Sequence, residues 1–184
     1  MTRSLSSRLV TLVAVSALMF LPAALLAEEL APASVQPRGV LDEPAPDLEL
    51  PDLEGNMVSL RSFPGKIVVF DFWAVWCGPC IDSIPFFQEI EERYGDQGVV
   101  VVGMHVDDNV PSTEEIQGYL DDRGAKYVNL LSTVEADEAF RIFAMPTTYI
   151  TDRDGIVRTR HIGFNPARTP DRLEKELRDL LGLE

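Results

Sequence analysis

The chain has 184 residues, of which 46% are hydrophobic and 25% charged, and these are the proportions of a globular protein. Sixteen Lys and Arg residues against 30 Asp and Glu give a formal net charge of −14, so a nucleic acid or an anionic membrane surface would repel the protein. The two cysteines are too few for the disulfide framework of a small secreted scaffold or for a four-cysteine zinc site. We therefore expect a single globular domain that binds no nucleic acid and in which the two cysteines act as a pair.

The first 27 residues have the pattern of an export signal. Arg3 and Arg8 precede an uncharged, mostly apolar run over residues 9–27. The arginines are expected to stay on the cytoplasmic side while the chain after Ala27 crosses the membrane. The run is long for a signal core and barely long enough for a helix across roughly 30 Å of hydrocarbon, so it is either cleaved after Ala27 or retained as an anchor. We expect a periplasmic or otherwise extracytoplasmic protein, either soluble or tethered by residues 9–27.

Residues 28–46 contain four prolines among Ala, Glu and Ser and show no apolar periodicity, which predicts an extended linker. The remaining residues, 47–184, suffice for one hydrophobic core. The hydrophobic pattern and the turn residues first predict a hairpin around Glu54-Gly55-Asn56, a buried strand over 66–73, a helix over 77–94 and a second buried strand over 99–106. A helix capped at Ser112 that ends near Gly124 and a strand over 127–131 follow, and then a helix through Ala136 and Phe143 that stops at Pro146. The chain ends in two strands, over 147–151 and 156–162, and a terminal helix capped by Thr169. Parallel strands linked by helices and closed by an antiparallel hairpin predict a three-layer α/β/α sandwich with an N-terminal β-hairpin.

The chemistry concentrates in the segment Trp76-Cys77-Gly78-Pro79-Cys80, where a buried strand turns into a helix. Unpaired N–H groups and the positive end of the helix dipole favour the thiolate of Cys77, which we expect to be the nucleophile. Two intervening residues on a helical turn bring Cys80 beside it, so Cys80 can resolve a mixed disulfide on Cys77. The pair can cycle between dithiol and disulfide, and we expect no cofactor besides this redox-active disulfide.

Two other interpretations of the cysteine pair remain open. A structural disulfide that closes four residues would add only about 2 kcal/mol of stability, which is little for the only disulfide that the chain can form. A metal site would need ligands beyond the two sulfurs, and only His105 and His161 are available as imidazoles. We predict the redox role and no metal site.

The segment Phe70-Asp71-Phe72-Trp73-Ala74-Val75-Trp76-Cys77-Gly78-Pro79-Cys80 closely resembles the active-site segment of thioredoxins. With the export signal, the N-terminal hairpin, the helix and strand inserted over 112–131, and Met145-Pro146-Thr147-Thr148, the region 47–184 resembles the extracytoplasmic TlpA-like thioredoxin family. The resemblance implies a thioredoxin fold and thiol–disulfide reductase activity, which in some members serves cytochrome c maturation. It also implies a cis peptide bond before Pro146, across from the cysteines, and backbone groups of Met145 that bind an extended substrate. From the residues alone, the bond before Pro146 could as well be trans.

Asp71 is set among apolar residues of a buried strand, where an ionised carboxylate is costly, so its pKa should be raised. By resemblance to thioredoxins, it would lie beneath the active site as the proton acceptor or relay for Cys80. The alternative is an ordinary acid exposed at the end of a strand.

The sequence departs from the family at two positions. Thioredoxins place a lysine near the buried acid on the neighbouring strand, whereas the strand over 99–106 has none and carries Gly103 near that position. Many TlpA-like reductases have a glutamate three residues after the second cysteine, and Ser83 stands there. We expect Trp73 to pack in the core, and Trp76 either to pack or to shape a substrate platform.

These observations predict a monomeric thiol–disulfide oxidoreductase that reduces disulfides of exported proteins, with apocytochrome c as a candidate substrate. Because an exported reductase works in an oxidising compartment, it needs a membrane electron donor, for which the DsbD type is the candidate. The expected substrate-binding residues are Trp76, Gly78, Pro79, Met145 and Pro146.

Two functions of other classes are kept as alternatives. A thiol peroxidase of the peroxiredoxin kind has a threonine three residues before its reactive cysteine, where this chain has Ala74. A non-enzymatic copper chaperone would use Cys77, Cys80 and His161, although copper-binding relatives space their cysteines by three residues rather than two.

Overall fold

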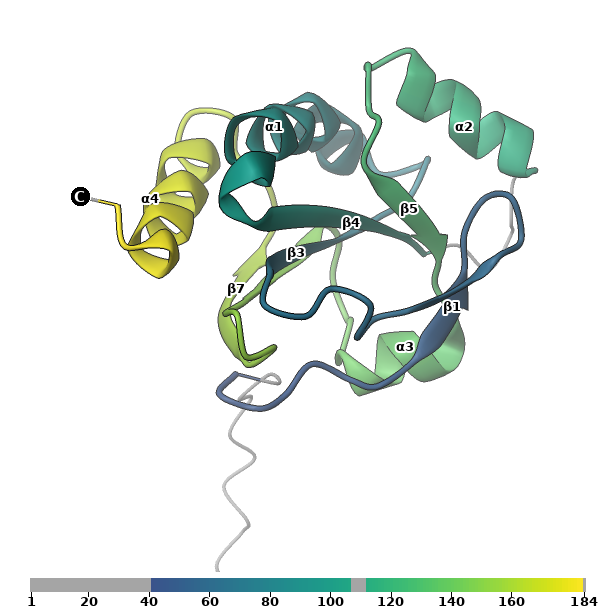
Figure 1. Cartoon of the computed structure of the whole chain (residues 1–184). Coiled ribbons are helices and arrows are strands. Elements are labelled where there is room, and N and C mark those ends of the chain that lie inside the picture. Colours follow the sequence, from purple (N-terminus) through teal and green to yellow (C-terminus); the bar gives the residue numbers. More distant parts are fainter. Residues whose placement is uncertain (1–40, 107–111, 184) are drawn as a thin grey trace, which may run out of the picture. The chain divides into compact units, whose positions relative to one another are not determined.

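The structure is a computed structural model, and it describes residues 41–106 and 112–183 (Figure 1). The predicted export signal over 1–27 and the linker residues up to 40 lie outside these ranges. None of the helices within them has both the length and the apolar character required to cross a bilayer.

A mixed sheet of five strands in the order β5-β4-β3-β6-β7 forms the centre of this unit. The strands are β3 (Ile67–Trp73), β4 (Val99–His105), β5 (Val128–Leu131), β6 (Thr147–Thr151) and β7 (Val157–Ile162). β3, β4 and β5 are parallel, whereas β6 runs antiparallel to β3 and β7 antiparallel to β6. Every residue of β3 and β6 is buried, which explains the nearly continuous apolar run of β3: both faces of a central strand are covered.

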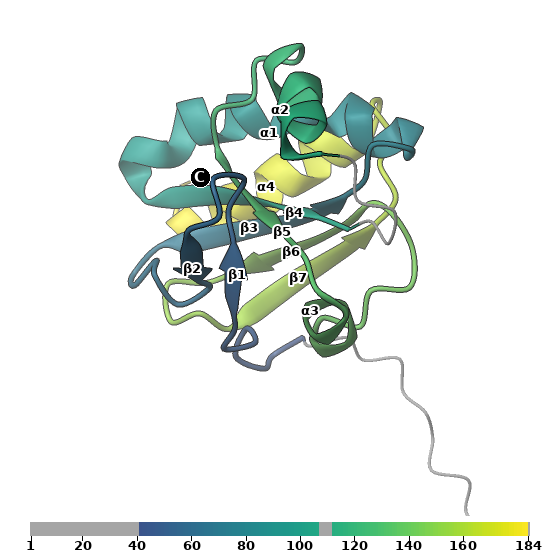
Figure 2. The ribbon, with the colours of Figure 1, turned by 90° about the vertical axis from the view of Figure 1, so that its right-hand side faces the viewer.

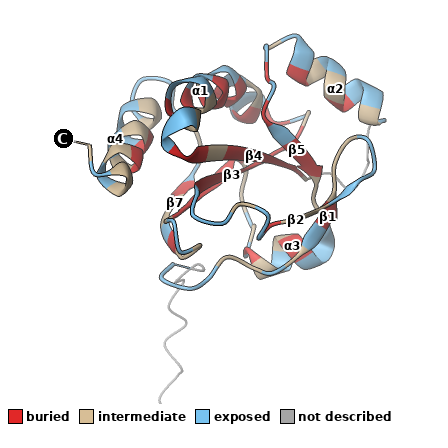
Figure 3. Cartoon of the chain, in the orientation of Figure 1, coloured by how far each residue is buried: buried red, intermediate tan, exposed pale blue. Residues whose placement is uncertain are grey.

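Helices cover both faces of the sheet, as the three-layer prediction requires (Figure 2). α1 (Gly78–Tyr94), α2 (Thr113–Asp121) and α4 (Thr169–Leu181) lie on one side, with the short 3₁₀ turn η2 (Gly95–Gln97) after α1. α3 (Val134–Ala139) and the hairpin of β1 (Glu49–Pro51) and β2 (Met57–Ser59) cover the other side. Figure 3 shows that the buried residues gather in the sheet and on the helix sides that face it.

Two hydrophobic cores result, one on each side of the sheet. The core under α1, α2 and α4 includes Val69 and Trp73 of β3, and the core on the α3 side includes Phe70 and Phe72. Side chains of β3 thus alternate between the two cores, because successive residues of a strand point to opposite faces.

α3 is shorter than the sequence predicts. It ends at Ala139 rather than at Pro146, and Arg141 adopts a φ of +53°, in the left-handed region that ends a helix. The carbonyl of Phe140 accepts a hydrogen bond from the Tyr149 hydroxyl at 2.5 Å, which fixes the chain to the sheet at that point. Phe143, which the prediction placed within the helix, is 69% exposed on the loop that follows.

α4 begins one residue earlier than predicted. Thr169 is the first helical residue and not the cap, because its hydroxyl accepts from the backbone N–H of Asn165 at 2.9 Å instead of from a helical N–H. The N-cap is Arg168, whose side chain makes no capping hydrogen bond. The predicted cap of α2 is confirmed, since Ser112 Oγ accepts from the N–H of Glu115 at 3.2 Å.

The last residues of the predicted linker belong to the folded unit. Asp42 N donates to Val157 O, Val157 N to Glu43 O and Ala45 N to Gly155 O, all at 2.8–2.9 Å. Residues 42–45 therefore pair with the hairpin of β6 and β7. The proline-rich composition did not reveal this pairing, because backbone hydrogen bonds leave no mark on composition.

Candidate active site

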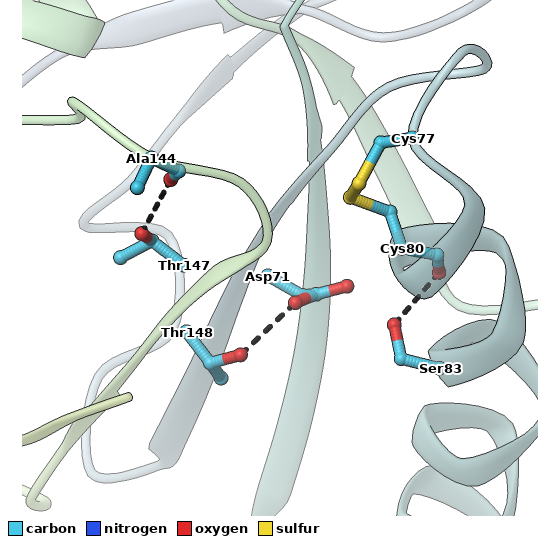
Figure 4. The surroundings of a disulfide bond; sticks show 7 residues. All are labelled: Asp71, Cys77, Cys80, Ser83, Ala144, Thr147 and Thr148. Atoms are coloured by element: carbon cyan, nitrogen blue, oxygen red, sulfur yellow. Dashed lines mark hydrogen bonds between the residues drawn. A yellow bond between two sulfur atoms is a disulfide. The ribbon is translucent and has the colours of Figure 1, made fainter. Parts of the chain in front are cut away.

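Cys77 and Cys80 stand where α1 begins, a few residues after β3 ends. Cys77 is the N-cap of the helix, and its carbonyl accepts from the N–H groups of Cys80 and Ile81 at 3.0 and 3.1 Å. Pro79 occupies the first turn, where its missing N–H costs no helical hydrogen bond. This turn holds the two Cα atoms 5.2 Å apart, and the sulfurs form a disulfide, which confirms the predicted pairing (Figure 4).

The start of α1 favours a negative charge on Cys77 once the disulfide is reduced. The first N–H groups of a helix lack intrahelical partners, and the helix dipole places its positive end there. No side chain caps this end, and the first turn contains no acidic residue that would compete for the same field. A thiolate at Cys77 is therefore stabilised relative to the thiol.

The two sulfurs differ in access. Cys77 is 6% exposed, whereas Cys80 has no exposed surface. Gly78 and Pro79 between them are exposed, so the approach to the disulfide is from the Cys77 side. Of the two cysteines, Cys77 is therefore the one that keeps some exposed surface.

Asp71 lies on β3 beneath the disulfide and is 0% exposed, so the alternative of an exposed acid at a strand end is wrong. Burial raises the pKa of its carboxyl from 3.8 to about 7. The Thr148 hydroxyl donates to Asp71 Oδ1 at 3.0 Å, and this hydrogen bond lowers the pKa by a smaller amount. Oδ2 has no hydrogen-bond partner among the described residues and points toward the part of α1 that carries Cys80 (Figure 4). The carboxyl can thus change protonation near neutral pH next to the buried sulfur.

Ser83 takes a structural role in the helix. It is fully buried, and its hydroxyl donates to the carbonyl of Cys80 at 2.7 Å (Figure 4). The position at which many TlpA-like reductases have a glutamate is therefore filled by a hydroxyl that bonds to the helix itself, and it holds no acid.

Gly103 on β4 lies directly beside Asp71, as the resemblance to thioredoxins suggested. Asn129, which the sequence analysis did not single out, explains why this position has no side chain. Asn129 on β5 is the register partner of Gly103, and a Cβ at position 103 would come within 2.0 Å of Asn129 Oδ1. The same oxygen accepts from Trp73 Nε1 at 3.1 Å, and Asn129 Nδ2 donates to Tyr127 O at 3.0 Å. A glycine inside an otherwise apolar strand is the signal that could have pointed to this close approach.

Trp73 is buried and Trp76 is exposed, which agrees with a structural role for Trp73 and a substrate platform at Trp76. Trp73 is fully buried, which confirms its structural role, and its ring meets His105 edge-on with centroids 4.9 Å apart. Trp76 is 65% exposed next to Cys77. It is therefore available to a substrate rather than used in packing.

The loop before β6 lies at the end of the sheet at which β3 leads to the disulfide. The peptide bond between Met145 and Pro146 is cis, as the resemblance implies. The ribbon between Ala144 and Thr147, which contains this bond, bends toward the disulfide (Figure 4), and Met145 packs against both cores. The carbonyl of Pro146 accepts from Gly163 N at 2.7 Å, and Thr147 Oγ1 donates to Ala144 O at 2.7 Å, so the loop is held on both sides.

His161, the third ligand of the copper alternative, makes a different contact. It is buried on β7, with its Nε2 2.7 Å from Glu176 Oε2 of α4. Within residues 41–106 and 112–183 there is no group of three or more His, Cys, Asp or Glu side chains arranged to hold a metal ion. The partnership of His161 with Glu176 was not foreseen from the sequence.

Comparisons with known proteins agree with this geometry. The model of the AhpC/TSA family matches residues 41–160. The thiol-disulfide oxidoreductase ResA of Oceanobacillus iheyensis is 31% identical over 142 residues, which cover 74% of this chain and 70% of the relative. The thioredoxin-like protein YneN of Bacillus subtilis is 29% identical over 119 residues, 65% of this chain and 69% of the relative. A crystal structure of a thiol:disulfide interchange protein assigned as DsbE, from Chlorobium tepidum, superimposes with a TM-score of 0.70 at 31% identity and covers 77% of this chain and 98% of that one.

Proposed function

Because the chain belongs to the AhpC/TSA family of thioredoxin-like proteins and is a thiol–disulfide oxidoreductase, we propose that it reduces disulfides of exported proteins outside the cytoplasm. The observation that carries this proposal is the Cys77–Cys80 pair at the uncapped start of α1, above the buried carboxyl of Asp71. The relatives named ResA and DsbE confirm the resemblance to the TlpA-like family.

The reaction proceeds in two exchanges of sulfur bonds. The Cys77 thiolate attacks one sulfur of a substrate disulfide, which forms a mixed disulfide and releases the other substrate sulfur as a thiolate. The Cys80 thiol then loses its proton and attacks the sulfur of Cys77, which forms the Cys77–Cys80 disulfide and releases the second substrate thiol. The substrate gains two electrons and the enzyme loses two, so a donor must reduce the enzyme before the next cycle.

Asp71 accepts the proton of Cys80 in the second exchange. A general base works best when its pKa is near the working pH, and burial brings the pKa of Asp71 to about 7. The unpartnered Oδ2 on the side of α1 is the oxygen that would take the proton. Asp71 thereby converts the buried thiol of Cys80 into the thiolate that attacks the mixed disulfide.

The substrate is held on the side where Cys77 is accessible. Trp76 and the exposed backbone of Gly78 and Pro79 supply contact surface around the sulfur. The backbone of Met145, before the cis bond to Pro146, offers N–H and C=O groups to an extended segment of the substrate. When the substrate segment binds in extended form, no folded part of the substrate blocks its cysteine from Cys77.

The sequence supports a proposed location and proposed partners. Residues 1–27 direct export, and residues 9–27 either leave with the cleaved signal or tether the protein to the membrane. In an oxidising compartment, a reductase needs electrons from across the membrane, so the donor is a membrane protein of the DsbD type. The enzyme acts as a monomer, and apocytochrome c is a candidate among its disulfide-containing substrates.

The test is to trap the substrate. Cys80→Ser removes the resolving sulfur, so the mixed disulfide on Cys77 should persist, and substrates should co-purify from the periplasm and be released by reductant. Cys77→Ser is the matched control, since it removes the attacking sulfur and should trap nothing. Equal recovery from both variants contradicts the proposal, and rapid turnover of hydrogen peroxide by the reduced enzyme would favour the peroxidase instead.

A further inference from the structure

A row of polar side chains crosses the face of the sheet beneath α1 and α4. Strand register places Asp71 of β3 beside Thr148 of β6, and Thr148 beside His161 of β7. Partners on one face of neighbouring antiparallel strands have their Cβ atoms about 4.5–5.5 Å apart, so the three side chains are consecutive neighbours. All three are buried.

The row continues from the sheet to the surface. Thr148 Oγ1 donates to Asp71 Oδ1 at 3.0 Å, and His161 Nε2 lies 2.7 Å from Glu176 Oε2 of α4. The other oxygen of Glu176 accepts from Arg172 Nε at 3.3 Å. The side chain of Glu176 is 23% exposed, so the row that begins at a fully buried carboxyl ends in contact with water.

Asp71 needs such a connection if it accepts a proton in every cycle. A carboxyl with no exposed surface cannot exchange protons directly with water, and only groups that both donate and accept can pass a proton onward. A hydroxyl and an imidazole are groups of this kind.

On the opposite side of Asp71, the described residues offer no comparable connection. Gly103 has no side chain, and Asn129 beyond it ends in an amide, which does not titrate near neutral pH. Tyr127, which comes just before β5, is buried, and its hydroxyl has no hydrogen-bond partner within residues 41–106 and 112–183. In the part of the chain that the structure describes, neither group is joined to Asp71 by a hydrogen bond, and neither leads on to an exposed carboxylate as His161 does.

We propose that Thr148, His161 and Glu176 form the proton route between Asp71 and solvent, an inference that rests on the proposed function. Protonated Asp71 passes its proton from Oδ1 to Thr148 Oγ1. The Thr148 hydroxyl, which forms no hydrogen bond with His161 in the described structure, then turns toward this register partner and releases its own proton to the imidazole. His161 releases a proton from Nε2 to Glu176, which passes it to water. Thr148, His161 and Glu176 each end with the number of protons they began with, and the one proton that Asp71 loses goes to water, so no oxidant, reductant or further reactant is required.

The experiment separates attack from resolution in a single turnover. A symmetrical aromatic disulfide releases one coloured thiolate when Cys77 attacks and a second when Cys80 resolves. At pH 6, Asp71 is mostly protonated and must lose its proton through the route before it can accept that of Cys80. In His161→Ala and in Glu176→Gln, we expect the second release to slow by about tenfold or more while the first is unchanged.

Three controls distinguish a proton route from a merely structural contact. Free imidazole should restore the second release in His161→Ala, since it can occupy the space of the missing ring, but not in His161→Gln, which fills that space. Glu174→Gln is the matched surface change on α4, because Glu174 binds Arg93 and Tyr94 instead of the row, and it should leave the second release unchanged. In the Asp71→Asn background, loss of His161 should cause no additional slowing.

The outcomes are distinct. A slowing that persists in full in the Asp71→Asn background, or that imidazole does not relieve, overturns the route while the proposed reductase activity stands. If Asp71→Asn itself leaves the second release unchanged, both the route and the proposed role of Asp71 fail, although Cys77 and Cys80 still act. If the first release is absent from the wild-type enzyme, the proposed function fails as a whole.

Discussion

The two faces of the central sheet are both buried, but they are built from different kinds of residues. The face beneath α1 and α4 carries, within its apolar core, the polar row of Asp71, Thr148 and His161 and, beyond Gly103, the amide of Asn129. The face toward α3 is dominated by an aromatic cluster of Phe70, Phe72, Phe140 and Tyr149, whose neighbouring rings lie 4.9–6.2 Å apart between centroids. Apolar packing stabilises the fold, whereas a buried carboxyl with an unpartnered oxygen costs stability.

The difference shows how one strand serves two purposes. β3 sends Phe70 and Phe72 into the aromatic face and Asp71 into the polar row, because its side chains alternate. The aromatic face toward α3 therefore adds stability, whereas the buried carboxyl of Asp71 lowers it on the face beneath α1. Variants on the two faces should therefore separate stability from catalysis.

The largest effect on stability is expected on the aromatic face. Phe140 is fully buried and its ring lies 4.9 Å from that of Phe72, so Phe140→Ala should lower the free energy of unfolding by about 4 kcal/mol. Denaturant unfolding measures this, and the single-turnover rates of the folded variant should match the wild type. The control is Phe143→Ala, an exposed phenylalanine three residues on, for which a change within about 0.5 kcal/mol is expected. Equal losses in the two variants would contradict the role of the aromatic face.

Next comes the charge of Asp71, whose effect depends on pH. Its pKa is raised from 3.8 to about 7 in the folded protein, so between these values the folded state binds more protons than the unfolded chain. The free energy of unfolding should therefore fall as pH rises from about 4 to about 7, by at most about 4 kcal/mol at about 1.4 kcal/mol per pKa unit.

Asp71→Asn tests this dependence, because it removes the titrating group and retains an oxygen that can accept from Thr148. We expect its stability to change little with pH through this group, and to exceed that of the wild type above pH 7. Denaturant titrations of the oxidised proteins from pH 4 to 8 measure both curves. Parallel curves would show that Asp71 ionises as readily in the folded state as in the unfolded one.

A smaller loss is expected where the strands of the polar face approach closely. Gly103→Ala would place a Cβ 2.0 Å from Asn129 Oδ1, so the amide must move and the hydrogen bond from Trp73 Nε1 is lost. We expect a loss of about 2 kcal/mol and a shifted NMR signal of the Trp73 indole N–H. Gly118→Ala on α2 is the control, because a Cβ there meets no atom within 4 Å, and it should stabilise by about 0.5–1 kcal/mol. If Gly103→Ala left the free energy of unfolding unchanged, the Asn129 side chain would be able to move aside at no loss of stability.

The smallest effect concerns Ser83. Its hydroxyl donates to the Cys80 carbonyl at 2.7 Å, so Ser83→Ala should cost about 1 kcal/mol, the usual net value of one hydrogen bond. The resolution rate should be unchanged, since no acid or base is removed. Ser62→Ala, in an exposed turn, provides the comparison and should be neutral. A tenfold change in resolution after Ser83→Ala would give this position a catalytic part that its hydrogen bond does not suggest.

Most of the fold could be predicted from the sequence. The strands that are buried on both faces are continuous apolar runs, and the turn residues between β6 and β7 mark the hairpin. The predicted continuation of α3 to Pro146 was wrong because apolar spacing does not show where a carbonyl is captured by a distant group, here the Tyr149 hydroxyl. The cap of α4 was misplaced for a similar reason, since the Thr169 hydroxyl has a partner outside the helix.

Only those features of the candidate site that depend on neighbouring residues along the chain could be predicted from the sequence. Cys77 and Cys80 follow from their spacing and their place at the start of a helix, and the raised pKa of Asp71 follows from its apolar neighbours. Asn129 and Glu176 were missed because their importance comes from partners 56 and 15 residues away along the chain.

The cysteine motif, the order of the elements and the sign of the pKa shift at Asp71 were readable from the chain alone, since period, spacing and composition act between near neighbours. Strand register and helix docking decided which polar groups stand beside that carboxyl. Thr148 and His161 join one row only because β6 and β7 fold back antiparallel next to β3, and Glu176 completes it only because α4 packs over them. Such contacts depend on which distant segments of the chain pack together. Local sequence patterns report on near neighbours and do not show that packing.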